Sequence, residues 1–546
     1  MALGIGRRSA LTSVVSVALA ETRTALRAVP AVLLSLAPIA AWAAASVILG
    51  VVVGLAAVIL PPMGAFGIVA LLALILLWVM PEMPLVYPGL IRKTFFVMLI
   101  VNLCVPTYYA VQIGGLPWIS ARRLATFTLI APFLLAISSS SQVRREIVER
   151  LRSSALIVLC ALGFLVMASL SVFTSMQPQE SISALSDAVL TWYITFFSAI
   201  YVVKNKDDTI FALKILCCCA LFVTAAGIVE FRMQHRIFLD VFPQSMLTSF
   251  IESNPAMALF LDPEKSFRGG LFRSSSVFLT ALSFGEFEIM VIPIGLFFAL
   301  HRKSLAERWL GWAVVLGGIA GIVVSGSRGG YVGLIASMAA FVAAWSIRKA
   351  RINRMSLAPA FVGLSGALSF ATVLGLIIFW RRAHNLVLGG GAEAASTEGR
   401  WVQWAAALPL IKSNPITGHG FATGGTDIGM SIDSYIISLL LETGVPGFLF
   451  FTGVACLPIW FGIRSYIYDV SESGALAGAL ACSFVAFTMY RIVLSQRENN
   501  MLAFFLLGLV VVSIYEYRKQ FAAERQSDTP RRGRYSRLQN GELRAT

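Results

Sequence analysis

Two short turns of the sequence combine arginine with glycine and serine. The first places Arg268 and Arg273 on either side of a Gly-Gly pair, directly before three serines. The second places Ser327 and Arg328 just ahead of an apolar stretch, so that both stand at the N-terminus of a predicted helix. Arginine binds phosphate oxygens through two N–H groups at once, and free N–H groups at a helix N-terminus attract anions. Both turns are therefore candidate phosphate sites, with a plain anchor at the membrane surface as the alternative role of each arginine.

A later stretch adds a third arginine and two acids. Arg400 begins a predicted helix whose apolar stripe, with two tryptophans, fits a helix that lies in the membrane interface. His419 follows in a glycine-rich turn, and Asp433 and Glu442 flank the start of the next apolar block. A carboxylate there can take a proton from a sugar hydroxyl, or it can pair with an arginine and hold the loop in place. Both interpretations stay open for Asp433, and the ion pair is favoured for Glu442.

The composition indicates what kind of scaffold must hold these residues. The chain has 546 residues, of which 58% are hydrophobic and 13% are charged, and its mean hydropathy is +0.80. A soluble protein is roughly half apolar and about a quarter charged. A water-soluble enzyme, a disordered protein and a fibrous protein are therefore excluded. In a membrane protein Lys and Arg mark topology, so the net charge of +15 does not indicate nucleic-acid binding.

About fourteen apolar blocks can cross a bilayer, for which a helix needs about 20 residues. They cover residues 38–60, 64–80, 94–110, 124–137, 155–174, 188–203, 210–229, 283–300, 309–324, 331–347, 357–380, 445–463, 475–494 and 501–515. Because unpaired backbone groups are costly in lipid, the predicted fold is an all-α, polytopic transmembrane helix bundle. Two long loops, 230–282 and 381–434, interrupt this bundle, and they carry most of the candidate residues and short helices of their own.

The positive charges orient the predicted bundle. An even number of spans places both termini on one side, and when that side is the cytoplasm most of the 43 Lys and Arg residues fall on inner segments. The two long loops then face outward. The exceptions to this charge rule are Arg122, Arg123, Arg491 and Arg497. The predicted organisation is a cytoplasmic segment over 1–30, a transmembrane domain over 31–516 and a basic, disordered cytoplasmic tail over 517–546.

Several kinds of chemistry have no signature in the sequence. It contains no Walker loop, no dinucleotide fingerprint and no His cluster with metal-ligand spacing, and its seven cysteines all fall within predicted spans. We therefore expect no cofactor and no metal. The compartment outside the membrane has no ATP, so a bond-forming enzyme there needs a preactivated donor such as a lipid diphosphate. Outward-facing arginines would stabilise the negative charge that develops as the diphosphate leaves.

Three stretches of the sequence, in this order, resemble one family. The runs SGSRGGYVGL at 325–334, GRWVQWAAALPLIKSNPITGHGF at 399–421 and SIDSYIISLLLETGVPGFLFF at 431–451 look like the O-antigen ligase and polymerase superfamily, which includes the Wzy-type polysaccharide polymerases. The resemblance implies an all-helical, metal-independent, inverting glycosyltransferase that takes a glycan from undecaprenyl diphosphate. It also implies that the family's arginines engage the diphosphate, and Arg273, Arg328 and Arg400 fall on the matching stretches.

One position departs from the pattern of the ligases in that family. The ligases carry a His-Asn pair ahead of the helix that here holds 439–442, and this chain has Ile432 and Asp433 there. The departure favours a polymerase of exopolysaccharide or O-antigen over a lipopolysaccharide ligase. The expected reaction moves a glycan to the acceptor hydroxyl of another lipid-linked repeat unit, on the periplasmic side of the bacterial inner membrane. The alternatives are ligase-type transfer to another acceptor, and a flippase or transporter of lipid-linked oligosaccharide.

Each candidate residue has an expected role in this reaction. Arg328 and Arg400 grip the donor diphosphate, Arg273 helps to place donor or acceptor, and Asp433 orients or deprotonates the acceptor hydroxyl. Further substrate contacts are expected from Arg268, Ser327, His419 and Glu442. A flippase would need ionisable residues deep in several spans, whereas the span interiors here read as nearly free of charge. The expected partners are undecaprenyl-diphosphate-linked oligosaccharide and membrane lipids, with a chain-length regulator and a flippase as further candidates and no nucleic acid.

Overall fold

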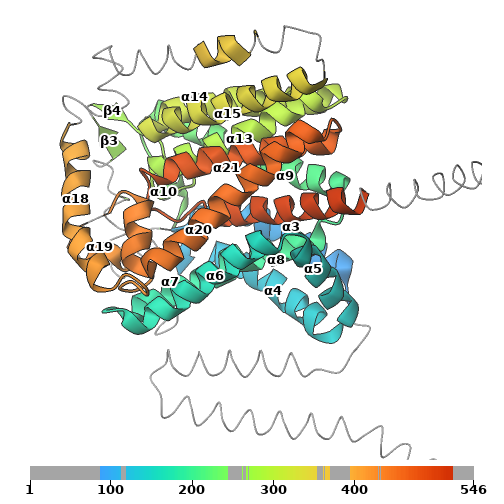
Figure 1. The fold of residues 1–546 in the computed structure, drawn as a ribbon. Coiled ribbons are helices and arrows are strands. Elements are labelled where there is room, and N and C mark those ends of the chain that lie inside the picture. Colours follow the sequence, from blue (N-terminus) through green and yellow to red (C-terminus); the bar gives the residue numbers. More distant parts are fainter. Residues whose placement is uncertain are drawn as a thin grey trace, which may run out of the picture. The chain divides into compact units, whose positions relative to one another are not determined.

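The structure is a computed structural model that describes residues 86–111, 119–243, 261, 266–268, 270–352, 361, 363–368, 394–427, 429–430 and 432–520 (Figure 1). This part of the chain is almost entirely helical, with two short antiparallel hairpins, so the all-α fold is confirmed there. Several predictions lie outside the described residues. They are the segment 1–30, the spans 38–60 and 64–80, most of the span 357–380, and the tail beyond residue 520.

Ten helices of the described part are long and apolar enough to cross a membrane. They are α4 (Ala121–Ser139), α6 with its 3-10 end η1 (Ala155–Thr174), the run α7–η2–α8 (Pro178–Val202), α9 (Lys206–Met233), α13 (Ala281–His301), α14 (Leu305–Ser325), α15 (Arg328–Ile352), α20 (Tyr435–Tyr468), α21 (Glu472–Arg491) and a last helix (Asn500–Gln520). Each overlaps a predicted span, and the predicted span 94–110 corresponds to the shorter α3 (Pro88–Cys104). The multi-pass architecture is therefore confirmed, and the number of about fourteen spans stays a prediction.

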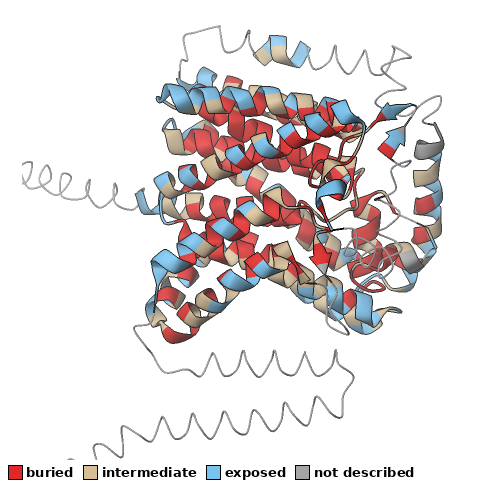
Figure 2. Cartoon of the chain, turned by 180° about the vertical axis from the view of Figure 1, so that it is seen from behind, coloured by how far each residue is buried: buried red, intermediate tan, exposed pale blue. Residues whose placement is uncertain are grey.

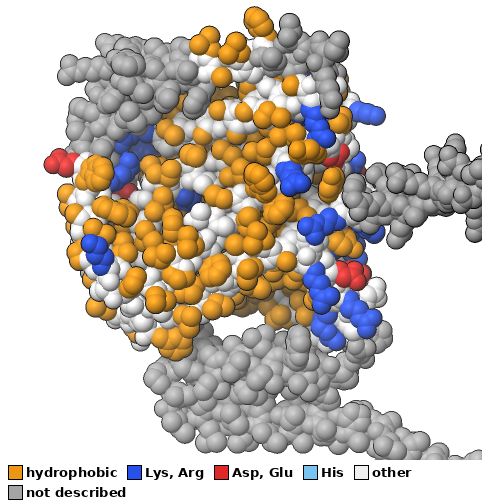
Figure 3. Space-filling model, viewed as in Figure 1, with side chains coloured by type: hydrophobic (Ala, Val, Ile, Leu, Met, Phe, Trp, Pro, Cys, Tyr) orange, Lys and Arg blue, Asp and Glu red, His pale blue; other side chains and the backbone are white. Residues whose placement is uncertain are grey.

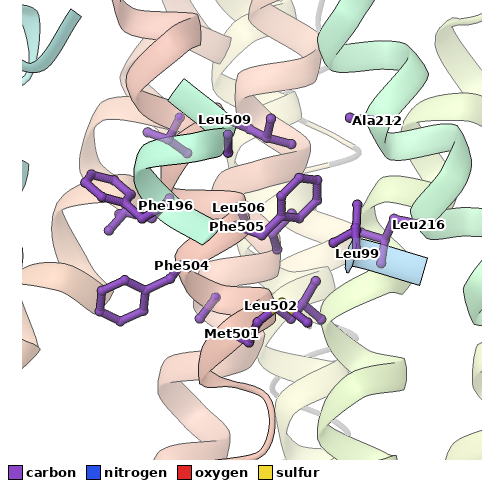
Figure 4. Close-up of a cluster of buried hydrophobic side chains, with 14 of the residues drawn as sticks. Leu99, Phe196, Ala212, Leu216, Met501, Leu502, Phe504, Phe505, Leu506 and Leu509 are labelled. Atoms are coloured by element: carbon purple, nitrogen blue, oxygen red, sulfur yellow. The ribbon is translucent and has the colours of Figure 1, made fainter. Parts of the chain in front are cut away.

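Buried residues fill the interior of the bundle (Figure 2), and among the membrane-length helices they are most frequent on α13, α21 and the last helix. Figure 4 shows apolar side chains of the last helix, among them Phe504 and Phe505, packed with Leu99 of α3 and Phe196 of α8. α13 approaches α14 closely, since a Cβ atom at Gly311 would lie 2.3 Å from the backbone nitrogen of Ala299. Small residues permit such close helix contacts in membrane proteins. The bundle is thus a tightly packed scaffold for its loops.

The surface of the bundle is apolar in its middle. Figure 3 shows hydrophobic side chains over the centre of one face, with Lys and Arg gathered toward its two ends. Large apolar side chains that are more than half exposed include Leu159, Leu316, Leu449 and Trp460, all on spanning helices. Exposed apolar patches of this size mark a surface that contacts a membrane or a partner. Here the pattern fits lipid contact along the helices and water at both ends.

The described loops fall at two opposite ends of the helices. At one end, which we call the loop end, lie α18 (Ala394–Ser413), α19 (Gly424–Asp427), α10 (Ile237–Val241) and the hairpin of β3 (Phe267–Arg268) with β4 (Leu271–Phe272), on the left of Figure 1. A second hairpin, β1 (Ala110–Val111) with β2 (Ile119–Ser120), joins α3 to α4, and α5 (Ser141–Ser153) lies at the opposite end. The described parts of both long loops therefore share one end, as the charge pattern predicts.

α20 is longer than the predicted span 445–463 and contains a break. Gly444 has φ +68° and ψ −176°, which interrupts the helix between Tyr435 and the membrane-length part. A Cβ atom at this position would lie 2.4 Å from the carbonyl oxygen of Ile416, so only glycine fits. The backbone nitrogen of Val445 also donates to the carbonyl of Pro415 at 2.8 Å. The glycine-rich turn after α18 is therefore held directly against the break in α20.

Candidate functional site

The turn between α14 and α15 forms as the sequence predicts. α14 ends at Ser325, Gly326 takes a left-handed conformation with φ +57°, and α15 begins at Arg328. The Ser327 hydroxyl accepts the backbone N–H of Gly330 at 3.3 Å, which caps the new helix. Arg328 thus stands at the positive end of a membrane-length helix, at the loop end, and its side chain is partly exposed.

Arg273 lies against this same turn. Its Nε donates to the carbonyl oxygen of Ser325 at 3.0 Å, and a Cβ atom at Gly326 would come within 3.2 Å of its Cγ. The next residue strengthens the attachment, because the backbone nitrogen of Ser274 donates to the carbonyl of Val324 at 3.1 Å. The structure therefore brings Arg273, from the first long loop, to the turn that carries Arg328. The other arginine of that loop, Arg268, lies on β3 opposite Leu271 of β4.

The predicted substrate contact Ser327 is engaged within the protein. Its side chain is fully buried, and its hydroxyl hydrogen-bonds with the hydroxyl of Tyr490. Tyr490 also donates to the carbonyl oxygen of Leu282 at 2.8 Å. α13 approaches this pair closely, since a Cβ atom at Gly285 would lie 3.0 Å from Cβ of Ser327. These contacts support a positioning role for Ser327, which locks the turn against α13 and α21.

Glu442 makes the ion pair that the sequence favours for it. Its carboxylate is buried and accepts from Nη2 of Arg497 at 2.7 and 2.5 Å, and from the hydroxyl of Ser438 at 2.6 Å. Burial alone would lower the pKa of Arg497, but Glu442 and Tyr435 raise it above its usual value. The guanidinium group also lies over the ring of Phe421, 4.8 Å from its centroid. Glu442 is therefore paired with a cation that remains charged.

His419 is also held by structural contacts. Its Nε2 hydrogen-bonds with the carbonyl oxygen of Leu410 at 2.8 Å and lies 3.2 Å from the hydroxyl of Ser413, both on α18. Its backbone nitrogen donates to the carbonyl of Leu441 at 2.8 Å, and Gly420 donates to the carbonyl of Glu442 at 3.2 Å. The histidine thus ties the turn to α18 on one side and to α20 on the other. Its geometry supports positioning of the loop more than contact with substrate.

Gln403 of α18 attaches the backbone of Asp433 to the helix that carries Arg400. The backbone N–H of Asp433 donates to Oε1 of Gln403 at 3.0 Å, and Gln403 lies one helical turn beyond Arg400 on α18. The Nε of Arg400 is buried and has no hydrogen-bond partner among the described residues. The side chain of Asp433 is partly exposed. The backbone of Asp433 is therefore held against α18 at the loop end, one helical turn from Arg400.

A short segment that contains none of the predicted site residues links the Arg273–Arg328 turn to the part of the loop end that holds Asp433. Residues 495–498, which we call the joining segment, connect α21 to the last helix at the loop end. The Ser495 hydroxyl donates to the carbonyl of Ile432, next to Asp433. Gln496 accepts from the hydroxyls of Thr280 and Ser283, just before and at the start of α13. Val493, just before the segment, packs where a Cβ atom at Gly329 would lie, 2.9 Å away.

The joining segment had one signal in the sequence, since Arg497, like Arg491 at the end of α21, is an exception to the charge rule. In the structure Arg491 is buried and pairs with Glu286 of α13 at 2.9 Å, while Asn499 donates to the same carboxylate at 2.9 Å. The expectation that span interiors are nearly free of charge is therefore wrong for α13. A second acid of that helix, Glu288, is buried too and accepts from Thr224 at 2.7 Å. Both acids are surrounded by apolar residues in the sequence, so both fell within the predicted span 283–300.

The arrangement at the loop end can hold an anion. Arg273 and Arg328 share a turn at a helix N-terminus, where backbone N–H groups and guanidinium groups both favour negative charge. On the other side of the joining segment, Asp433 is held by Gln403 of α18, one helical turn beyond Arg400. Within the described residues, no group of three His, Cys, Asp or Glu side chains is placed to hold a metal ion. The candidate site therefore consists of the Arg273–Arg328 turn and the part of α18 that carries Arg400, with the joining segment between them.

Comparison with known proteins assigns a family to part of this arrangement. No curated protein matches the chain. Residues 312–452 match the model of the family Wzy_C, described as O-Antigen ligase. The matched stretch contains Arg328, Arg400 and Asp433, whereas Arg273 and the joining segment lie outside it. The chain is thus a multi-pass membrane protein that carries, over residues 312–452, an O-antigen ligase domain of the Wzy_C family.

Proposed function

We propose that this protein is a membrane polysaccharide polymerase. It transfers a glycan from an undecaprenyl-diphosphate-linked donor to the acceptor hydroxyl of another lipid-linked repeat unit, on the periplasmic side of the bacterial inner membrane. The O-antigen ligase domain supports glycan transfer of the ligase or polymerase type. Ile432 and Asp433, in place of the His-Asn pair of ligases, support the polymerase within that class. The product belongs to exopolysaccharide or O-antigen biosynthesis.

One observation carries this proposal most directly. Arg273 is fixed by the carbonyl of Ser325 on the very turn from which α15 and Arg328 begin. Two cations from separate parts of the chain thus flank a helix N-terminus at an end of the bundle, beside the apolar, lipid-contacting surface. A lipid diphosphate has the matching shape, with its anionic group at the membrane surface and its tail in the bilayer. Arg328 and Arg273 would hold that group, and Arg400 would approach it from α18.

The proposed reaction exchanges one glycosyl bond for another. The acceptor hydroxyl oxygen attacks the anomeric carbon of the donor, from the face opposite the diphosphate, so the configuration inverts. The bond from that carbon to the phosphate oxygen breaks, and its electron pair leaves with the lipid diphosphate. Arg328 and Arg400 stabilise the charge that develops, and loss of one such contact raises the barrier by about 3 kcal/mol. Asp433 accepts the proton of the attacking hydroxyl, a role worth roughly 100-fold or more in rate.

The buried acids of the bundle do not favour a flippase. Glu286 and Glu442 are each paired with an arginine close to the loop end, and Glu288 accepts from Thr224 across a helix contact. A transport pathway needs ionisable groups that line a route across the membrane. These acids instead tie helices together around the loop end. Their pairing supports chemistry at one face of the membrane over transport through it.

The test is the length of the glycan made by cells whose only copy of the protein carries Arg328→Ala or Arg400→Lys. A polymerase without its diphosphate contacts adds single repeats or none, so we expect short products at a normal level of membrane protein. Matched controls remove a cation from the same helices away from the site. Lys349→Gln lies near the opposite end of α15, and Lys412→Gln lies on the exposed last turn of α18.

The outcomes separate the proposal from its alternatives. Short products from the two arginine variants and long products from both lysine variants would support the polymerase. Long chains that accumulate on the lipid carrier, without reaching their final acceptor, would support ligase-type transfer instead. Loss of all lipid-linked glycan from the outer face would support a flippase. Unchanged long chains in Arg328→Ala would remove its proposed role.

A further inference from the structure

A second group of buried polar side chains lies at the loop end, apart from the residues discussed so far. Tyr108 lies in the turn after α3, Arg122 lies in the first turn of α4, and Arg236 lies between α9 and α10. Their exposed fractions are 1%, 9% and 6%, so all three are at least nine-tenths buried. In the sequence, Arg122 stands out only as an exception to the charge rule. None of the three lies in the matched O-antigen ligase domain.

Each arginine of this group is anchored by one hydrogen bond to the backbone. Nε of Arg122 donates to the carbonyl oxygen of Val105 at 2.7 Å, and Nη2 of Arg236 donates to the carbonyl of Leu279 at 3.2 Å. Apolar contacts fix the surrounding chain, since Tyr108 packs in a cluster with Leu239 of α10. The fold thus sets the positions of both guanidinium groups. In each group one nitrogen donates to the backbone, and other nitrogens remain available as donors.

The remaining polar atoms of the group are almost all donors. The Tyr108 hydroxyl, Nη2 of Arg122, and Nε and Nη1 of Arg236 are buried and have no hydrogen-bond partner among the described residues. The nearby acids are largely occupied. Glu498 accepts the N–H of Leu279 at 3.0 Å, and one oxygen of Glu230 accepts from Ser274, Ser275 and Ser276, which leaves only its Oε1 without a partner.

The unsatisfied donors are connected through Glu498. Its carboxylate accepts from the hydroxyl of Thr107, next to Tyr108, at 3.0 Å and from the N–H of Leu279, the residue whose carbonyl anchors Arg236. Arg122 is anchored on Val105, in the same turn after α3 as Tyr108. Buried donors without acceptors are costly and rare in native proteins, so they indicate a group that the protein binds. Several N–H and O–H donors around two cations call for an acceptor-rich, negatively charged group. A neutral sugar hydroxyl would leave most of these donors unpaired.

We propose that Tyr108, Arg122 and Arg236 form a second oxyanion site, which binds a phosphate or carboxylate group of the second substrate. The proposal rests on the proposed function, because a polymerase takes two lipid-linked glycans and so has two anionic groups to place. The source of the oxyanion is either the diphosphate of the second lipid carrier or the carboxylate of an acidic sugar in the glycan. Both present the same acceptor chemistry to these donors.

The two oxyanion sites lie within reach of each other. The segment 273–279 has Arg273 at one end, bound to Ser325, and Leu279 at the other, bound to Arg236 and Glu498. Six residues span at most about 20 Å even when fully extended. In between, the serines of this segment are fixed on Glu230 of α9. One rigid segment therefore sets the spacing between the site of the donor and the proposed site of the second substrate.

Two neighbouring tyrosines provide a matched test. Tyr108→Phe removes a hydroxyl that has no partner in the described protein, so stability should be unchanged or slightly higher. Tyr109→Phe removes a hydroxyl that donates to the carbonyl of Phe238 at 2.7 Å, so stability should fall. Full-length protein in detergent is titrated with inorganic pyrophosphate, and separately with glucuronate, and its thermal unfolding is recorded. For at least one probe, Tyr108→Phe should bind about tenfold more weakly and Tyr109→Phe should bind as the wild type does.

The result also identifies the source of the oxyanion. Weaker binding of pyrophosphate alone to Tyr108→Phe assigns the site to the second lipid carrier, and weaker binding of glucuronate alone assigns it to an acidic sugar. Wild-type affinity of Tyr108→Phe for both probes would overturn the proposal. Arg328→Ala should abolish a separate pyrophosphate site and leave the effect of Tyr108→Phe in place. Failure of the proposed function would show in glycan length, whereas failure of this inference would show in the binding assay.

Discussion

At the scale of single residues, the loop end is stabilised by charges paired over long distances in sequence. Arg497 pairs with Glu442, and Arg491 pairs with Glu286. Both acids are almost completely buried, with exposed fractions of 2% and 0%. A buried ion pair contributes little when it is compared with a well-packed apolar pair, but loss of one partner leaves an uncompensated charge and costs about 3–5 kcal/mol.

Glu442→Gln is therefore expected to destabilise the protein by about 3 kcal/mol, at the low end of this range, because the side chain of Arg497 is 24% exposed and water screens part of its uncompensated charge. The measurement is thermal unfolding of the full-length protein in detergent. Replacement of both partners, with Glu442→Gln and Arg497→Gln together, should recover part of the loss. If Glu442→Gln unfolded like the wild type but no longer extended glycan chains, Glu442 would act on substrate and the structural assignment would be wrong.

At the scale of elements, the α14–α15 turn depends on Gly326 for its shape, and this turn positions both Arg273 and Arg328. Gly326 has a left-handed backbone, and the side chain of Arg273 fills the space beside it. A Cβ atom there would lie 3.2 Å from Cγ of Arg273. The left-handed conformation of Gly326 ends α14, and it also leaves room for Arg273 to donate to the carbonyl of Ser325. The shape of the candidate site depends on this turn as much as on the arginines themselves.

Gly326→Ala should shorten the glycan by displacing Arg273, in addition to a strain of about 1–2 kcal/mol from the left-handed backbone. Gly270→Ala is the matched control. Gly270 also has a left-handed backbone, with φ +80°, but nothing lies within 4 Å of its hypothetical Cβ atom. Both variants carry the same kind of backbone strain, and only the first meets Arg273. Equal glycan length in the two variants would show that the position of Arg273 is unimportant.

At the scale of the whole molecule, the bundle separates two ends with different tasks. The loop end carries the candidate site, α18 and the joining segment. At the opposite end, Arg302 pairs with Glu307 and Glu472, and Lys206 also pairs with Glu472. The positive-inside rule predicts that this second end faces the cytoplasm. The proposed reaction requires that the loop end face the periplasm.

Cysteine labelling tests this orientation. In a background without the seven native cysteines, Lys412→Cys lies at the loop end, and Lys349→Cys lies near the opposite end of α15. Both positions are exposed. A thiol reagent that cannot cross the membrane should label the first variant in intact spheroplasts, and should label the second only after the membrane is permeabilised. The reverse pattern would place the candidate site in the cytoplasm and rule out the proposed periplasmic reaction.

Much of the fold could be predicted from the sequence because lipid imposes a local rule. A spanning helix needs a long apolar block, so α3 and the ten described helices of membrane length each overlap a predicted span. A helix start is equally local, which is why Ser327 and Arg328 were placed correctly at the N-terminus of α15. The sequence by itself thus determined the class of protein, the helical segments and the loops that share an end.

Only the tertiary structure decided which polar groups meet. Glu286 and Glu288 read as part of an apolar span, and Arg497 read as an exception to a charge rule, until their partners were placed beside them. Arg236 and Tyr108 showed no pattern at all. These contacts join residues that lie far apart along the chain, and no periodicity or spacing encodes them. They depend on how whole helices pack, which is a property of the three-dimensional arrangement alone.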